Sequence, residues 1–206
     1  MGRVSANAIE PGCPKASGLV SLWGGLIVLA ALLFAGVSHS TAATSATVGT
    51  LKIGAALPPL AGRNLADEKV TVLDAAQGRV TLLALGFSYD SRHAVDAWAD
   101  RFRGEFHADS GVTCLELPMM SGVGARMGKP FIERGMRSGT PKALYRNVVV
   151  VWSGVGDWKE RLHVRDSKLA YLMLLDRNGR LVWSGTGARD VKGYERLSAR
   201  VRALRP

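Results

Sequence analysis

Residues 79–87 read RVTLLALGF, a nearly unbroken apolar run that follows the turn residues Gln77 and Gly78. A run of this kind is typical of a central strand that is covered on both faces of its sheet. Residues 91–106 then show the spacing of an amphipathic helix, whose apolar side consists of Val95, Trp98, Phe102 and Phe106. Residues 112–117 form a second apolar run. The order of strand, helix and strand predicts a parallel pair joined by a right-handed crossover.

The end of the chain predicts an antiparallel hairpin followed by a helix. Residues 169–175 and 180–183 are strand-like and flank a turn built on Asn178 and Gly179. The last helix follows two glycines, and its apolar stripe consists of Tyr194, Leu197, Val201 and Leu204. Between the two halves we expect a helix near 130–136, a strand at 148–152 and a short helix near 157–162.

The N-terminal part of the chain has no Asp, Glu, Lys or Arg between Lys15 and Lys52. Residues 18–37, GLVSLWGGLIVLAALLFAGV, contain one polar side chain and are long enough to cross a membrane as a helix. Positive charge is greater before this span than directly after it, which places the start of the chain in the cytoplasm. We therefore predict four segments, namely a cytoplasmic leader at 1–17, a transmembrane or signal-anchor helix at 18–38, a flexible tether at 39–51 and a folded domain at 52–206.

This arrangement predicts a single-pass protein of a bacterial inner membrane with its C-terminal domain in the periplasm. The first residues lack the arginine-rich pattern of a mitochondrial transit peptide. A cleaved signal peptide, which would release the domain into the periplasm, is the alternative because small residues follow the span at 40–46.

The charge of the chain is strongly positive, with 27 Lys and Arg against 17 Asp and Glu, a formal net charge of +10. On a domain held at a membrane, such an excess favours anionic lipid head groups as the partner rather than nucleic acid. Arg196 and Arg200 lie on one face of the last predicted helix and are candidates for this contact. A basic helix face that is only solvated is the alternative.

The order of elements resembles that of thioredoxin-like proteins, and residues 54–60, GAALPPL, are similar to the lead-in of peroxiredoxins and membrane-tethered thioredoxin domains. The resemblance implies an α/β three-layer sandwich with a central mixed sheet and helices on both faces. In those enzymes the strand that corresponds to 79–87 ends in an aromatic residue and a CxxC motif, or leads to a peroxidatic cysteine. If Tyr89 takes the place of the aromatic residue, Asp90 and His93 occupy the two cysteine positions. Ala170 stands where a cis-proline would precede the hairpin.

These departures argue against thiol chemistry, because disulfide exchange and peroxide reduction both require a thiolate. Cys114 lies within an apolar strand and is expected to face the core. Asp90, Arg92 and His93 are instead interpreted as a polar cluster at the start of the helix, with Ser91 or Asp90 as its cap. A redoxin-class thiol oxidoreductase or peroxiredoxin-like enzyme with a degenerate active site, using Cys114 or an unconventional group, remains the alternative function.

We expect neither a metal nor another cofactor. The four histidines have no paired spacing of the kind that metal sites use. Residues 121–129, SGVGARMGK, are similar to a phosphate-binding loop but lack its Gly-Lys-Ser/Thr ending, because Pro130 follows Lys129.

Residues 171–183, YLMLLDRNGRLVW, with the glycines at 185 and 187, resemble the signature of the ATPase assembly factor ten family, which are thioredoxin-like assembly factors of the F-type ATP synthase. The resemblance covers about residues 70–204. It implies a membrane-anchored, non-catalytic assembly factor or chaperone whose client is a membrane protein, in that family the membrane sector of the ATP synthase. Trp152 and Trp158 flank a loop with two glycines, and we consider them further candidates for client binding.

Overall fold

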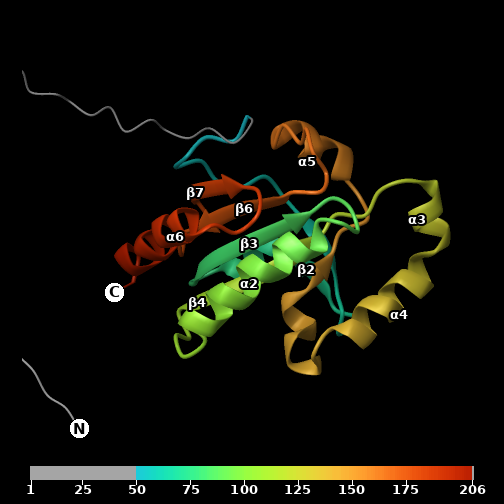
Figure 1. Cartoon of the computed structure of the whole chain (residues 1–206), viewed down its shortest axis with the longest axis horizontal. Coiled ribbons are helices and arrows are strands. Elements are labelled where there is room, and N and C mark those ends of the chain that lie inside the picture. Colours follow the sequence, from blue (N-terminus) through green and yellow to red (C-terminus); the bar gives the residue numbers. More distant parts are fainter. Residues whose placement is uncertain (1–49, 206) are drawn as a thin grey trace, which may run out of the picture. The chain divides into compact units, whose positions relative to one another are not determined.

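The structure is a computed structural model that describes residues 50–205 (Figure 1). The predicted leader at 1–17, the predicted membrane span at 18–38 and nearly all of the predicted tether lie outside these residues. Within residues 50–205, none of the helices combines the length and the apolar character needed to cross a bilayer.

A four-stranded mixed sheet forms the centre of the domain. Its strand order is β4-β3-β6-β7, where β3 pairs in parallel with β4 and antiparallel with β6, and β6 pairs antiparallel with β7. Every residue of β3 before Gly86 is buried, as the apolar run predicts. The predicted parallel pair and C-terminal hairpin are therefore confirmed. The four strands are β3 (Val80–Gly86), β4 (Val112–Pro118), β6 (Ala170–Leu175) and β7 (Leu181–Thr186).

A smaller antiparallel sheet in the order β2-β1-β5 continues the central sheet beyond β4. Parallel bridges from Glu116 to Val148 and from Met119 to Val151 join the two sheets. The strand predicted at 148–152 is thus shorter than expected. The three strands are β1 (Ala61–Asn64), β2 (Lys69–Thr71) and β5 (Val149–Val150).

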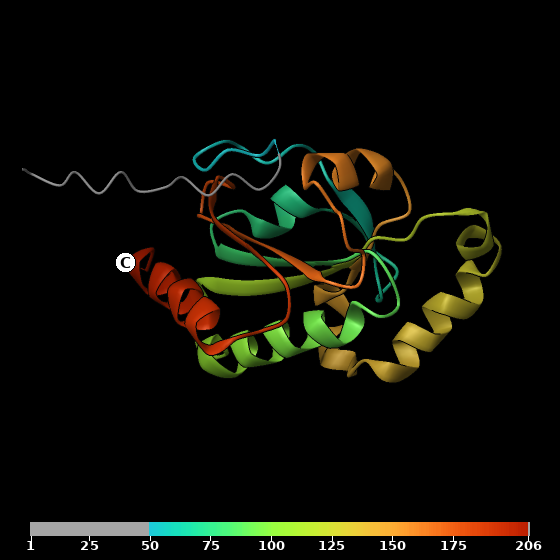
Figure 2. The ribbon, with the colours of Figure 1, turned by 45° about the horizontal axis from the view of Figure 1, so that its top comes forward.

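Helices cover both faces of the central sheet, as Figure 2 shows. Side chains of α2 and α6 pack with Val80, Leu82 and Ala84 on one face. Side chains of α1 and α5 pack with Leu83 and Leu85 on the other. The predicted three-layer α/β sandwich is confirmed. These helices are α1 (Val72–Ala76), α2 (Arg92–Phe106), α5 (Val155–Arg161) and α6 (Val191–Ala203).

Two further helices lie to one side of these layers, α3 (Val123–Met127) and α4 (Lys129–Gly139), drawn in yellow in Figure 1. Neither contains a buried residue. A 3-10 helix, η1 (Lys142–Asn147), then returns the chain to β5. The helix predicted near 130–136 is confirmed within α4. Helix α3 was not predicted, and it lies within residues 121–129, which the sequence analysis compared with a loop.

The folded domain includes the last residues that we predicted as tether. The Thr50 backbone N–H donates to the Arg161 carbonyl at 2.9 Å, and Leu51 is buried among the core residues that face α5. Leu51 therefore belongs to the domain, because burial of its apolar side chain in the core removes apolar surface from water.

Candidate functional site

The loop that joins β3 to α2 contains the positions where a thiol enzyme of this fold would carry its cysteines. The buried Ser91 organises the loop, since its hydroxyl donates to the Ser88 carbonyl at 2.7 Å and accepts from the Ser88 N–H at 3.3 Å. Gly86, the last residue of β3, permits this arrangement. A Cβ at Gly86 would lie only 2.7 Å from the Ser91 hydroxyl oxygen.

Ser91 occupies the N-cap position of α2 but does not cap the helix with its side chain. Its backbone is already helical, with φ −67° and ψ −16°, and its hydroxyl bonds to Ser88 instead. The predicted capping interaction is therefore wrong, because the side chain is directed back into the loop.

Asp90 and Ser88 contact the segment that leads into β6. The Asp90 carboxylate forms a 3.4 Å ion pair with the Lys168 ammonium, and the Ser88 hydroxyl donates to the Ser167 carbonyl at 2.8 Å. Ala170, fully buried, pairs with Gly86 across the sheet. The structure thus brings the loop after β3 next to Ala170, and the predicted degenerate positions occupy one edge of the domain.

Tyr89 is exposed at this edge, at 74%. The Arg92 guanidinium carbon lies 4.8 Å from the centre of its ring, within the range of a cation–π interaction. His93 is exposed on the first turn of α2. The edge therefore presents an aromatic and several charged groups to solvent, and none of the residues named here carries a thiol.

Cys114 is the one cysteine of residues 50–205 and is buried in the middle of β4. It faces α2 within the core cluster that contains Phe102 and Leu172. Burial raises the pKa of its thiol to about 12. A thiol in this state is almost entirely protonated at neutral pH and is a poor nucleophile. The prediction that Cys114 faces the core is confirmed.

A group of charged side chains lies between α2 and β4. Arg103 pairs with Glu116, and its other guanidinium nitrogen lies 2.7 Å from the Asp100 carboxylate. Burial raises the pKa of Glu116, and Arg103 opposes this shift. Burial also raises the pKa of Asp96, with a further contribution from Asp100. Despite these carboxylates, residues 50–205 contain no cluster of three or more His, Cys, Asp or Glu that is arranged to hold a metal ion.

The two candidate tryptophans differ in their environment. Trp158 is buried between α5 and the central sheet, so it is a core residue and not the exposed client-binding aromatic that we predicted. Trp152 is half-buried, and its indole N–H donates to the Glu133 carboxylate at 3.2 Å. The Lys129 ammonium lies 5.3 Å from the Trp152 ring centre. Trp152 therefore connects α4 to the domain.

Arg196 and Arg200 are exposed on α6 and form no ion pair with any residue of the described part of the chain. Two neighbouring arginines behave differently. Arg202 bonds to Glu105 at 2.8 Å, and Arg205 bonds to Asp109 at 2.6 Å. Part of the positive charge at this end of the chain is thus neutralised. The contact of Arg196 and Arg200 with an anionic surface stays a prediction.

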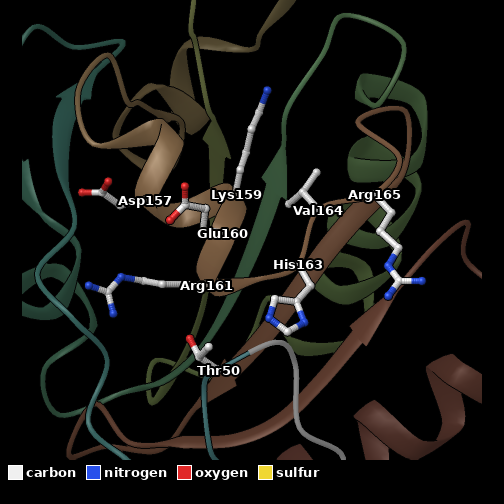
Figure 3. Close-up of a pocket in the computed structure, with 8 residues that line it drawn as sticks. All are labelled: Thr50, Asp157, Lys159, Glu160, Arg161, His163, Val164 and Arg165. Atoms are coloured by element: carbon white, nitrogen blue, oxygen red, sulfur yellow. The ribbon is translucent and has the colours of Figure 1, made fainter.

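A shallow cavity of about 750 Å³ lies at the end of α5 (Figure 3). Figure 3 shows that the side chains of Lys159, Arg161 and Arg165 point in different directions and do not converge on one point. The cavity therefore lacks the convergent charge that an anionic ligand would need. It is lined by Thr50, Asp157, Lys159, Glu160, Arg161, His163, Val164 and Arg165.

The most prominent surface feature that sequence reasoning missed is on α3 and α4, where three large apolar side chains are exposed. They are Val123, Met127 and Phe131. Their spacing of four residues is a visible signal in the sequence, but the glycines at 122, 124 and 128 obscured the helix.

The chain was compared with protein-family models, with curated proteins and with solved structures. A protein-family model described as ATP10 protein matches residues 54–204. No curated protein matches the chain significantly in sequence.

Several solved structures are similar in fold. The thioredoxin domain of a thiol-disulfide oxidoreductase from Bacteroides vulgatus is 17% identical, with a TM-score of 0.51 over 73% of this chain and 99% of that one. The exposed lipoprotein thioredoxin Etrx1 from Streptococcus pneumoniae is 17% identical, with a TM-score of 0.50 over 71% and 100%. BsSco, a member of the Sco family of cytochrome c oxidase assembly proteins, is 12% identical, with a TM-score of 0.52 over 72% and 92%. At these identities the likeness shows the thioredoxin-like fold alone.

Proposed function

The chain belongs to the ATP10 protein family, and on that basis we propose that it is a membrane-anchored, non-catalytic assembly factor or chaperone for a membrane protein complex. The proposed client is a subunit of the membrane sector of the ATP synthase. The proposed site of action is a bacterial inner membrane, with the folded domain on the periplasmic side, either anchored by residues 18–38 or released after signal cleavage.

The observation that carries the non-catalytic part of the proposal is the loop between β3 and α2. Under the resemblance to thioredoxin-like enzymes, Asp90 in this loop and His93 on the first turn of α2 stand where the two thiols would be. Ala170, which pairs with Gly86 at the end of β3, stands where such enzymes carry a proline. The thiol of Cys114, the cysteine of the folded domain, is a poor nucleophile, because burial raises its pKa to about 12. These features support binding, rather than thiol exchange, as the task of the domain.

The membrane part of the proposal is supported by the sequence before the domain and by the charge on α6. Residues 18–37 have the length and apolar composition of a membrane-spanning helix. Arg196 and Arg200 are exposed and are free to approach anionic head groups. A domain held in this way stands beside newly inserted membrane subunits.

The client is tested by affinity capture of the full chain from native membranes after mild solubilisation. We expect a membrane subunit of the ATP synthase to be enriched. The matched control is a chimera in which residues 1–51 of this chain carry an unrelated thioredoxin domain. Equal capture of that subunit by the chimera would contradict the proposed client.

The alternative, a redoxin-class enzyme with a degenerate site, is tested by insulin reduction and peroxide consumption with the same full chain. We expect turnover no higher than that of buffer with reductant alone. Activity that the Cys114→Ser variant loses would overturn the non-catalytic assignment. Activity that this variant keeps would also overturn it, and would direct attention to the edge that contains Asp90 and His93.

A further inference from the structure

Helices α3 and α4 carry an exposed apolar ridge, which we define as Val123, Met127 and Phe131. These side chains are 76%, 81% and 82% exposed. Large apolar side chains gathered on one surface usually mark a site that another molecule or a membrane covers. None of the three lines the cavity at the end of α5.

The ridge crosses the junction between α3 and α4 at Gly128, which forms one helical hydrogen bond to each helix. The Gly128 N–H donates to the Gly124 carbonyl at 3.0 Å, and the Ile132 N–H donates to the Gly128 carbonyl at 2.9 Å. Residues four apart in a helix lie on the same side. Val123 and Met127 therefore share one side of α3, and Phe131 follows one turn later in α4.

The opposite side of α4 is held to the domain, which fixes the orientation of the ridge. Met136 packs against the small core cluster that contains Leu65 and Val150. The Arg137 Nε donates to the Leu65 carbonyl at 3.0 Å, and the Tyr145 hydroxyl donates to the Arg137 carbonyl at 2.8 Å. Because these contacts occupy the inner side, the ridge faces away from the domain.

The surface around the ridge is positively charged. Residues 121–139 contain four basic residues and one acidic residue. Lys129 and Arg137 are engaged with Glu133 and Asp67. Arg126 and Arg134, each within one turn of the ridge, are exposed and have no ion-pair partner among residues 50–205.

We propose that the apolar ridge inserts into the interfacial region of an anionic lipid bilayer, with Arg126 and Arg134 at the level of the head groups. An exposed apolar stripe flanked by unpaired basic residues is the pattern of helices that lie in a membrane interface. A projecting ridge suits this role, because the bilayer deforms around it.

This inference rests on the membrane location in the proposed function. About 12 residues separate the apolar span from Thr50, a length of roughly 40 Å when extended. A domain on such a connection stays close enough to the bilayer for a second, weaker contact. The ridge would then orient the domain relative to the membrane and present the edge with Tyr89 and Asp90 in a defined direction.

The test uses the full chain in a Cys13→Ser background, which leaves the buried Cys114 as its other thiol. A fluorophore is attached at Phe131→Cys, and the chain is reconstituted into phosphatidylcholine vesicles with or without phosphatidylglycerol. Brominated acyl chains report contact with lipid, and acrylamide reports contact with water. We expect several-fold stronger quenching by brominated lipid, and weaker quenching by acrylamide, in the anionic vesicles.

The matched control is the same label at Tyr89→Cys, since Tyr89 is also exposed, at 74%, but lies in the loop between β3 and α2. This label is expected to stay accessible to acrylamide. A second pair of variants tests the charge. Arg126→Gln with Arg134→Gln should reduce the preference of the Phe131 label for anionic vesicles, whereas Lys52→Gln with Lys69→Gln, which removes the same charge elsewhere, should leave it unchanged.

Three results would overturn the inference. The first is equal quenching of the two labels, and the second is equal lipid contact in neutral and anionic vesicles. The third is protection from acrylamide without quenching by lipid, which would show that a protein segment or a second copy covers the ridge. A chain that does not stay with the vesicles at all would refute the membrane location in the proposed function as well, so the two failures are distinguishable.

Discussion

The thiol of Cys114 lies between the central sheet and α2, opposite Leu82 on the neighbouring strand. Its position explains why this fold can keep a cysteine without redox chemistry. The environment is apolar, and burial there disfavours the charged thiolate more than the nearby Arg103 favours it. A side chain in such a position contributes to packing and behaves as a small apolar group.

We predict that Cys114 resists alkylation in the folded protein. In the Cys13→Ser variant, iodoacetamide at mildly alkaline pH should modify the thiol about a thousandfold more slowly than in guanidinium, because the pKa is raised from 9.0 to about 12. Mass spectrometry of quenched time points measures both rates. Similar rates in the folded and unfolded protein would show that the thiol is accessible and that an enzymatic role deserves renewed consideration.

Among the helices, α2 and α6 are joined by one carboxylate. Glu105 of α2 accepts hydrogen bonds from the Tyr194 hydroxyl at 2.9 Å, the Ser198 hydroxyl at 2.5 Å and the Arg202 guanidinium at 2.8 Å. The Tyr194 ring also packs against Trp98, with 6.2 Å between ring centres. The C-terminal helix is therefore held by polar contacts at its outer edge in addition to its buried apolar stripe.

Removal of this carboxylate should destabilise the domain. Glu105→Ala is expected to lower the free energy of unfolding by about 1–3 kcal/mol, because Tyr194 and Ser198 lose a charged acceptor. Glu195→Ala, at an exposed acid of α6, is the matched control and should change the value by less than about 0.5 kcal/mol. Urea unfolding followed by circular dichroism measures both. Equal effects of the two substitutions would contradict a structural role for Glu105.

The contribution of Glu105 should also depend on pH in a defined direction. Burial acts to raise the pKa of this carboxyl, but the hydrogen bonds from Ser198, Tyr194 and Arg202 outweigh it and hold the pKa below the ordinary value of 4.5. A group whose pKa is lower in the folded state stabilises that state above its unfolded pKa and ceases to do so as the pH falls through its folded pKa. The difference between wild type and Glu105→Ala should therefore be full at neutral pH and decrease below about pH 4.5. A difference that is constant down to strongly acidic pH would be inconsistent with this account.

For the whole molecule, the relevant property is the distribution of its net charge of +10. The pairs of Arg202 with Glu105 and of Arg205 with Asp109 belong to the architecture. The unpaired Arg196 and Arg200 are available for electrostatic contact with a surface. Location of charge, and not only its total, should then decide how the domain meets a membrane.

We predict that residues 50–206, prepared without the preceding apolar segment, bind anionic vesicles at low salt. Arg196→Gln with Arg200→Gln should weaken binding by about 10- to 30-fold, since each well-placed basic residue contributes about 1 kcal/mol. Lys52→Gln with Lys69→Gln removes the same charge from other exposed positions and should have a smaller effect. Co-sedimentation with vesicles measures binding, and added salt should weaken it. Equal retention on neutral vesicles would disprove the electrostatic account.

The elements that the sequence identified correctly are those whose pattern is local. The strands β3, β4, β6 and β7 and the helices α2 and α6 each contain a complete apolar periodicity, and the Asn-Gly turn between β6 and β7 is marked by its own residues. The burial of Cys114 follows from the same pattern. Local patterns are sufficient there because one buried face specifies the register of a strand or helix.

Tertiary contacts decided the rest. The short strand β1 gains its partners from far along the chain, since Arg63 pairs with Val150, and no period of three or four residues announces such a strand. Trp158 is buried and Trp152 is half-buried because of the surfaces that they meet, a difference that their flanking residues do not encode. The ridge of Val123, Met127 and Phe131 is exposed for the same reason. Its residues have the composition of a core face, and only the folded domain shows that α3 and α4 turn that face outward.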